Sequence, residues 1–132
     1  MDTKEQAIRD LYAARGRRDW DAVRALFAAE IGWHEPGEED HSGDFRGVDE
    51  VVALLQKLDD VTEGTFQLEP VVFLNSTEHS AVLVRWGAER DELRSEGNEI
   101  AVYRFADGKI AQVWFYVDGF EPESFSAVFR FD

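Results

Sequence analysis

The sequence predicts an α+β fold, with helices in the first half of the chain and an antiparallel sheet in the second. Up to about residue 64, apolar side chains recur mainly every three or four positions, the spacing of an amphipathic helix. From Thr65 onward they alternate with a period of two, which is typical of strands. A chain of 132 residues is long enough to bury one core, so we expect a single domain over residues 1–132.

The first thirty residues predict a pair of helices. Thr3 and Gln6 have the spacing of a capping box, and apolar residues then recur at helical spacing up to Gly16. Asp19 is suited to cap a second helix, which we expect to end near Glu30.

Three arginines, Arg15, Arg17 and Arg18, cluster at the end of the first helix. Such a cluster commonly complements the negative end of the helix dipole and solvates the corner. An anion-binding site is the alternative interpretation.

The next segment predicts a strand, a loop and a third helix. A strand is expected at residues 31–36, because the Pro36-Gly37 pair ends an extended segment sharply. The polar residues that follow, up to Gly47, form a loop long enough to act as a lid. Valines and leucines at helical spacing from Val48 onward then predict a helix that closes near Gly64.

The second half predicts four antiparallel strands joined by hairpins. The expected strands lie near residues 65–75, 79–90, 97–106 and 109–118. The turn at Asp107-Gly108 is the strongest local signal, because this pair readily adopts the positive φ angles of a tight hairpin.

Both faces of the last two strands are apolar. One face carries Ala101, Tyr103, Phe105, Val113, Phe115 and Val117, and the other carries Ile100, Val102, Trp114 and Tyr116. Three short helices can cover only one face, so the other needs a ligand cavity, a partner subunit or both. We expect a homodimer that buries the face with Trp114 and Tyr116. The phenylalanines that follow Gly119 are expected to pack back onto the sheet.

The composition excludes several classes of partner. With 28 acidic and 14 basic residues, the formal net charge of −14 repels nucleic acid and anionic membrane surfaces. The absence of cysteine excludes disulfides and thiolate chemistry. The N-terminal residues are too polar for a signal peptide, and no apolar run is as long as a transmembrane helix, so a cytoplasmic protein is expected.

The element order and several short motifs resemble those of the nuclear-transport-factor-2-like superfamily. The residues that carry the resemblance are Ala25 to Glu30, the Glu35-Pro36 pair, Gly43 and Gly47 before the third helix, and Arg104-Phe105 followed by Asp107-Gly108-Lys109. They are similar to the branch that contains ketosteroid isomerase and SnoaL-like polyketide cyclases. The resemblance implies a cone-shaped, curved antiparallel sheet wrapped around three N-terminal helices, with a pocket inside.

The resemblance also implies roles for single residues. The general-base aspartate of the isomerase corresponds to Glu35, which keeps a carboxylate. Its tyrosine falls on Leu11, with Tyr12 one position away, and its protonated aspartate falls on Ala101. Leu11 and Ala101 offer no hydrogen-bond donor to an enolate, so a different donor set is needed. Tyr12, Tyr103, His34 and His41 are the candidates.

We therefore predict a catalytic set and a substrate-binding set. The catalytic candidates are Glu35, His34, Tyr12 and His41, and the substrate-binding candidates are Trp33, Asp44, Leu11, Ala101, Tyr103, Val113, Phe115 and Val117. His34 precedes Glu35 in an extended segment, so the two should face opposite sides. Neither a metal nor a cofactor is expected, since His34, His41 and Glu35 lack the spacing that metal sites usually show.

The predicted function is acid–base chemistry on a small hydrophobic molecule that contains a carbonyl group. Isomerisation, cyclisation and dehydration all begin with proton abstraction next to a carbonyl, with Glu35 as the base. A binding protein with the same pocket and no turnover is the main alternative. A module that binds another protein through its aromatic sheet face is the third hypothesis.

Overall fold

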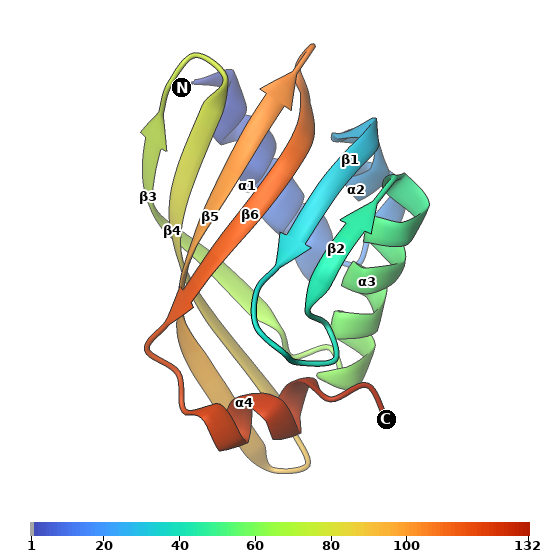
Figure 1. Ribbon diagram of the computed structural model, residues 1–132, viewed down its shortest axis with the longest axis vertical. Helices are drawn as coiled ribbons and strands as arrows, with labels where there is room; N and C mark the ends of the chain where they lie inside the picture. The colour runs from blue at the N-terminus through green and yellow to red at the C-terminus, as the bar shows by residue number, and fades with distance from the viewer. Residues whose placement is uncertain (1) are drawn as a thin grey trace.

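The computed structural model describes residues 2–132, which form one curved sheet with helices on its concave side and at one end (Figure 1). The helices are α1 (Thr3–Gly16), α2 (Trp20–Ala25), α3 (Val48–Val61) and α4 (Pro122–Phe129). The strands are β1 (Phe27–Glu35), β2 (Gly43–Arg46), β3 (Gln67–Asn75), β4 (His79–Arg90), β5 (Leu93–Ala106) and β6 (Lys109–Asp118). The six strands are ordered β2-β1-β6-β5-β4-β3.

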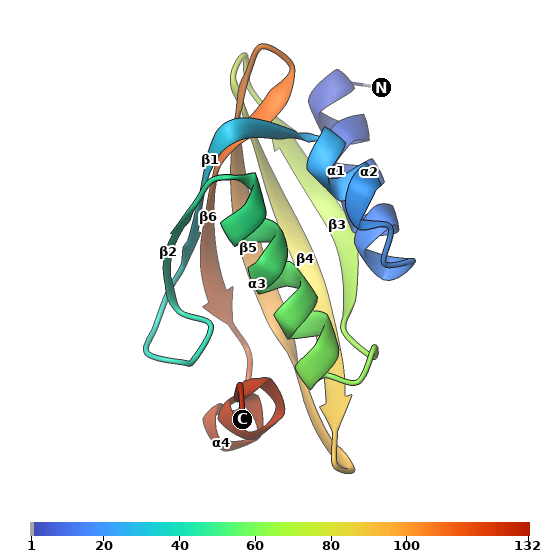
Figure 2. The same cartoon turned by 90° about the vertical axis from the view of Figure 1, so that its right-hand side faces the viewer.

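The core lies between the concave face of the sheet and the helices α1 and α3. Figure 2 shows these two helices on the same side of the sheet, with α4 near the opposite end from α2. The apolar stripe of α3 is fully or almost fully buried, as the spacing of its valines and leucines predicts. Alternate residues of β4, β5 and β6 are buried on the concave side, which leaves their neighbours along each strand on the convex face.

The start of α1 and the end of α2 differ from the prediction. Asp2, not Thr3, caps α1, because its carboxylate accepts a 2.8 Å hydrogen bond from the backbone N–H of Lys4. Helix α2 ends at Ala25, and the residues expected to continue it begin β1. They are extended because β1 pairs in parallel with β6, starting where the N–H of Ile110 donates to the carbonyl of Leu26 at 2.9 Å. Long-range pairing here overrides the local helix preference.

The acidic loop after β1 is shorter than predicted, because residues 43–46 form the edge strand β2. This strand pairs antiparallel with β1, with Gly43 opposite Glu35. Two hydrogen bonds hold the remaining loop against the rest of the domain. The hydroxyl of Ser42 donates to the carbonyl of Pro36 at 2.8 Å, and Asp40 accepts from the backbone N–H of Phe131 at 2.7 Å. It is therefore part of the wall of the domain.

The predicted α+β class is correct, but the structure differs from the predicted architecture in two details. A fourth helix, α4, lies near the C-terminus, in addition to the three helices predicted in the first half of the chain. The sheet is mixed, since β1 runs parallel to β6 while the other pairs are antiparallel. The four-stranded meander itself matches the prediction, except that β5 begins at Leu93.

The C-terminal tail forms α4, which packs against one end of the sheet as the phenylalanine-rich sequence predicts. Glu121 caps this helix by accepting hydrogen bonds from the N–H groups of Glu123 and Ser124, and Pro122 occupies the first turn. The side chains of Phe125 and Phe129 are buried. Within residues 2–132, no helix has the length and apolar character needed to cross a membrane.

Candidate active site

A small internal cavity lies at the end of the core that α4 covers. Its volume is about 40 Å³. Its lining comprises Arg15, Trp33, Glu35, His41, Leu58, Phe66, Leu68, Trp86, Glu99, Phe115, Val117, Phe125 and Phe129. Two carboxyl groups, one guanidinium and one imidazole thus face a mainly apolar and aromatic space, which accepts only a group of a few atoms.

Glu35 is the last residue of β1, and its side chain enters the cavity on the same face as Trp33. The indole N–H of Trp33 donates a 2.8 Å hydrogen bond to the Glu35 carboxylate. Burial disfavours the charged form and raises the pKa of Glu35 to about 7, although the Trp33 hydrogen bond and the charge of Arg15 act in the opposite direction. Near neutral pH this carboxyl group therefore exists in both protonation states.

Glu99 is the second carboxyl group of the cavity, and the sequence analysis missed it. It lies on β5, on the same face as Ala101 and Tyr103. Burial raises its pKa to about 8, and the negative charge of Glu35 adds to the rise while Arg15 opposes it. The signal was present in the sequence, because a glutamate two positions before Ala101 shares the inward face of the strand.

Arg15, in the last turn of α1, also faces the cavity. Its guanidinium carbon lies 5.9 Å from the ring centre of Trp33 and 5.7 Å from that of Phe66, so two aromatic rings hold it in place. Among residues 2–132, no carboxylate forms an ion pair with Arg15. For this arginine cluster the main prediction was a role complementing the helix dipole, and an anion-binding site was the alternative.

His41 is buried beneath α4 and does not move freely in a loop. Its ring lies 5.6 Å from the ring of Phe125 and 5.7 Å from that of Phe129, measured between centres. Only 7% of its surface is exposed, and its Nδ1 has no hydrogen-bond partner among the described residues. Burial lowers the pKa of His41, although the nearby Glu39 and Asp40 oppose this effect, so the imidazole is neutral at pH 7.

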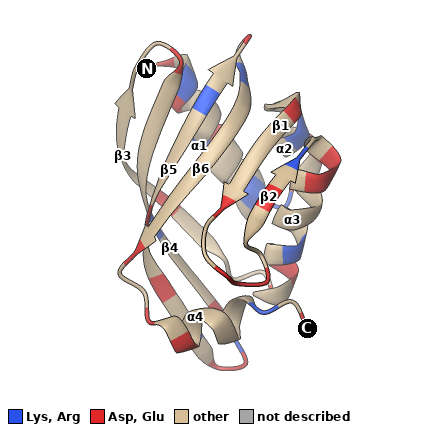
Figure 3. Ribbon diagram, viewed as in Figure 1, with Lys and Arg blue, Asp and Glu red and all other residues tan. Residues whose placement is uncertain are grey.

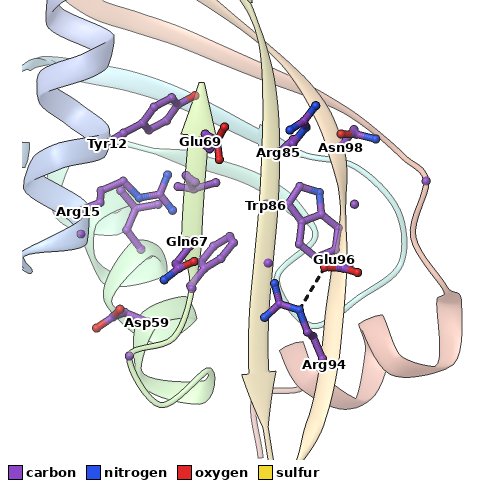
Figure 4. Close-up of a pocket in the computed structure, with 18 of the residues that line it drawn as sticks. Tyr12, Arg15, Asp59, Gln67, Glu69, Arg85, Trp86, Arg94, Glu96 and Asn98 are labelled. Carbon is purple, nitrogen blue, oxygen red and sulfur yellow. Dashed lines mark hydrogen bonds and ion pairs between the residues drawn. The ribbon is translucent and has the colours of Figure 1, made fainter. Parts of the chain in front are cut away.

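An open groove of about 780 Å³ adjoins the cavity (Figure 4). Four residues line both spaces, namely Arg15, Phe66, Leu68 and Trp86. The groove has room for a drug-sized ligand, whose pockets are typically about 300–1,000 Å³, whereas the cavity does not. We call these four shared residues the neck.

Tyr12 lines the groove and is bonded to Tyr103. The two hydroxyl oxygens are 2.7 Å apart, and the rings meet edge to face. Burial raises the pKa of both phenols, which keeps them protonated at neutral pH. Each hydroxyl is the other's hydrogen-bond partner, so Tyr12 is placed beside the site and does not point its hydroxyl at Glu35.

His34 of the predicted catalytic set and Asp44 of the predicted substrate-binding set do not line the cavity. Both side chains lie on the convex face of the sheet, because His34 alternates with Glu35 along β1. The imidazole is 2.7 Å from Asp44 through Nδ1 and 2.7 Å from Gln112 through Nε2, and it stacks on Trp114. Partial burial lowers the pKa of His34, but these hydrogen bonds outweigh it and raise the pKa overall.

The remaining predicted substrate-binding residues divide into two groups. Trp33, Phe115 and Val117 line the cavity. The core residues Leu11, Ala101, Tyr103 and Val113 are fully buried and do not line it.

The donor set at the cavity does not form a metal site. Within residues 2–132, no three His, Asp or Glu side chains lie close enough together to hold a metal ion. Of the three histidines, His41 alone lines the cavity, because His34 lies on the convex face and His79 is exposed at the start of β4.

The fold and the site together define an α+β domain with a curved, unclosed sheet and with two acidic groups in a cavity that adjoins an open groove. Residues 8–113 match the family model described as a SnoaL-like domain, and the chain belongs to this family. The resemblance to the nuclear-transport-factor-2-like superfamily is thereby confirmed.

Proteins similar to this chain cover almost its whole length. An uncharacterised protein of Mycobacterium tuberculosis is 31% identical over 122 residues, which are 91% of this chain and 93% of that protein. The structure of Bal32a from a soil-derived mobile gene cassette superimposes with a TM-score of 0.88 at 23% identity, over 97% of both chains. TerC, co-crystallised with polyporic acid, gives a TM-score of 0.82 at 17% identity, over 97% of this chain and 98% of TerC.

Proposed function

We propose that this protein is an enzyme that transfers a proton next to a carbonyl group of a hydrophobic small molecule. The observation that carries the proposal is the pair of half-buried glutamates that line one cavity, with a pKa of about 7 for Glu35 and about 8 for Glu99. Two titratable groups whose pKa values lie on either side of the working pH can act as base and acid.

Glu35 is the base in this proposal, because it has the lower pKa of the two and loses its proton first. Glu99 then remains protonated and can donate a hydrogen bond to the carbonyl oxygen of the substrate. As Glu35 removes the proton, negative charge grows on that oxygen, and the O–H of Glu99 stabilises it in a site with little water. Isomerisation, cyclisation and dehydration share this first step.

The alternative of a binding protein without turnover is less well supported. A binder needs a pocket of suitable shape, whereas an enzyme needs a second polar group that converges on the site of Glu35. Glu99 meets that requirement. A carboxyl group in an apolar site lowers the stability of the folded protein when the group is charged.

The test is deuterium exchange at the α-carbon of β-tetralone, a hydrophobic ketone, followed by NMR in D₂O. The wild-type protein should accelerate exchange, and Glu35→Gln should remove the acceleration, because the amide keeps the shape but cannot accept the proton. A positioned general base is worth about 10²–10⁴-fold, so the loss is measurable. Glu35→Gln with undiminished exchange would exclude Glu35 as the base.

The pH profile of the same exchange provides a second test. The rate should rise as Glu35 ionises near pH 7 and fall as Glu99 ionises near pH 8, which gives a narrow bell. Because the groups interact, the two apparent pKa values belong to the pair. In Glu99→Gln the alkaline limb should disappear.

We also propose that the convex face of the sheet forms a homodimer interface. In the register of β4, β5 and β6, Leu83 lies opposite Ile100, and Ile100 lies opposite Tyr116. These side chains form one apolar row and are 37%, 46% and 64% exposed, respectively. Trp114 lies in the next row.

The distribution of charge favours a second copy of the same chain as the partner. Figure 3 shows few charged positions along the upper parts of β5 and β6, although the chain as a whole carries a net charge of −14. A twofold axis over this row would bring the same apolar patch from each subunit together. The charges that lie outside this patch would be far apart in such a dimer, and salt screens the repulsion between them.

A further inference from the structure

Arg15 is a cation at the neck between the groove and the cavity, and no carboxylate of residues 2–132 pairs with it. Other arginines of this acidic chain do find such partners, for example Arg24 with Asp49 at 2.6 Å and Arg94 with Glu96 at 3.1 Å. Arg15 is half-buried and lines both spaces. Leaving a partly desolvated guanidinium without an acceptor is unfavourable, so its retention needs a reason.

The cavity carboxylates do not supply that reason. Neither Glu35 nor Glu99 lies within ion-pair distance of Arg15, and pairing with a guanidinium would hold a carboxyl pKa below its usual range. The pKa values of both groups are raised instead. Asp59, a further acidic group whose pKa the charge of Arg15 affects, pairs with Arg18 at 3.6 Å.

The geometry also favours an external acceptor. The rings of Trp33 and Phe66 lie within cation–π distance of the guanidinium, an interaction that leaves its N–H donors available. Figure 4 shows Arg15 extending from α1 toward the strands that carry Gln67 and Trp86, across the groove. A planar guanidinium held in this way matches the two oxygens of a carboxylate.

We infer that the substrate carries a carboxylate in addition to its carbonyl group, and that Arg15 at the neck binds this carboxylate. The inference rests on the proposed function, since it assigns the substrate class of the same site. The sizes of the groove and the cavity then indicate which part of the ligand each of them holds. The apolar body lies in the groove of about 780 Å³, and the reacting carbon with its carbonyl oxygen enters the cavity of about 40 Å³.

Arg15 thus orients the substrate, because it fixes one end at the neck and directs the other toward Glu35 and Glu99. The carboxylate also adds a negative charge near both glutamates, which further disfavours their ionised forms. Binding of an anionic ligand should therefore be accompanied by proton uptake at neutral pH.

The test compares β-naphthoate with β-naphthamide, which have the same shape and differ in charge. Isothermal titration calorimetry in two buffers of different ionisation enthalpy gives both the affinity and the protons taken up. The wild-type protein should bind β-naphthoate at least about tenfold more tightly than the amide, since charge-assisted hydrogen bonds are roughly twice as strong as neutral ones. Proton uptake should accompany the binding of β-naphthoate alone.

Arg15→Met keeps most of the side-chain volume and should abolish the preference for β-naphthoate while leaving the affinity for β-naphthamide within about threefold. Arg15→Lys should restore part of the preference. The matched control is Arg17→Met, which removes an exposed arginine two residues away that lines neither space and should leave the preference intact. Circular dichroism and a melting curve confirm that each variant is folded.

Three results would overturn the inference. They are equal affinity of the wild-type protein for the two probes, a preference that survives Arg15→Met, and the absence of binding of either probe up to millimolar concentration. The β-tetralone exchange separates this failure from that of the proposed function, because β-tetralone is neutral. Exchange that depends on Glu35 without a preference for β-naphthoate would leave the enzyme proposal standing and remove only the substrate class.

Discussion

The two buried carboxyl groups should make the stability of this protein fall as the pH rises through neutrality. The pKa of Glu99 is 4.5 before burial and about 8 in the folded protein, and that of Glu35 rises from 4.5 to about 7. A group whose pKa is raised by folding binds its proton more tightly in the folded state. Its favourable contribution is therefore complete below about pH 4.5 and is lost as the pH rises through the folded pKa.

The expected magnitude is large compared with the stability of a small domain. One pKa unit corresponds to about 1.4 kcal/mol, so ionising Glu99 in the folded protein costs up to about 5 kcal/mol, and ionising Glu35 up to about 3 kcal/mol. The two costs are not additive, because part of the shift of Glu99 is caused by the charge of Glu35. A domain of this size is stable by only about 5–15 kcal/mol.

The perturbation is Glu99→Gln, which removes the titration and keeps the shape. The free energy of unfolding, measured by urea denaturation, should be similar for wild type and variant near pH 5, where Glu99 is protonated. At about pH 9 the variant should be more stable than the wild type by at least about 2 kcal/mol. The difference between the two proteins isolates Glu99 from every other titrating group.

Glu96→Gln is the matched control, since Glu96 is exposed on the same strand and pairs with Arg94. It should change the free energy of unfolding by less than about 1 kcal/mol, with little dependence on pH. Parallel stability curves of wild type and Glu99→Gln between about pH 5 and 9 would refute the reasoning, because they would mean that Glu99 ionises in the folded protein as easily as in water.

Three further outcomes are expected. Tyr116→Asp places a charge in the apolar row of the convex face, so light scattering should show a dimer for the wild type and a monomer for the variant; a wild-type monomer at micromolar concentration would contradict the proposed interface. His34→Ala should leave β-tetralone exchange within about twofold of wild type, because the imidazole lies on the opposite face from Glu35; a loss as large as that of Glu35→Gln would return the histidine to the catalytic set. Dialysis against EDTA should leave exchange and melting temperature unchanged, since the chain has no cysteine and His41 is the one histidine that lines the cavity; stoichiometric zinc or iron in the purified protein would count against this.

Much of the fold was accessible from the sequence because it is encoded in local periodicity. The apolar spacing in α1 and α3, the alternation in β4 to β6 and the Asp107-Gly108 turn are all short-range signals, and they predicted elements that the structure contains. The start of β1 and the strand β2 were missed because they depend on partners. Phe27 pairs with Ile110 of β6 at the start of β1, and residues 43–46 pair with β1, so both segments depend on strands that are distant in the sequence or follow a loop.

The residues of the candidate site likewise include some that local sequence patterns place and some that only the tertiary structure brings together. Alternation along β1 and the resemblance to ketosteroid isomerase were enough to place Glu35 inside and His34 on the other face, and the same alternation could have placed Glu99. No local pattern could show that Arg15 of α1 reaches the same cavity as Glu99 of β5, because the curvature of the sheet and the packing of α1 and α4 bring them together.

By itself, the sequence determined the α+β class, the meander and an inward carboxylate at Glu35, since these follow from the spacing of residues along one segment. Only the tertiary structure decided which groups share the cavity with Glu35, that His41 is buried under α4, and that Arg15 stands at the neck without an ion-pair partner. The physical reason is that burial and charge depend on all neighbours in space, and it is burial that raises the pKa of Glu35 and Glu99 into the range where acid–base chemistry works.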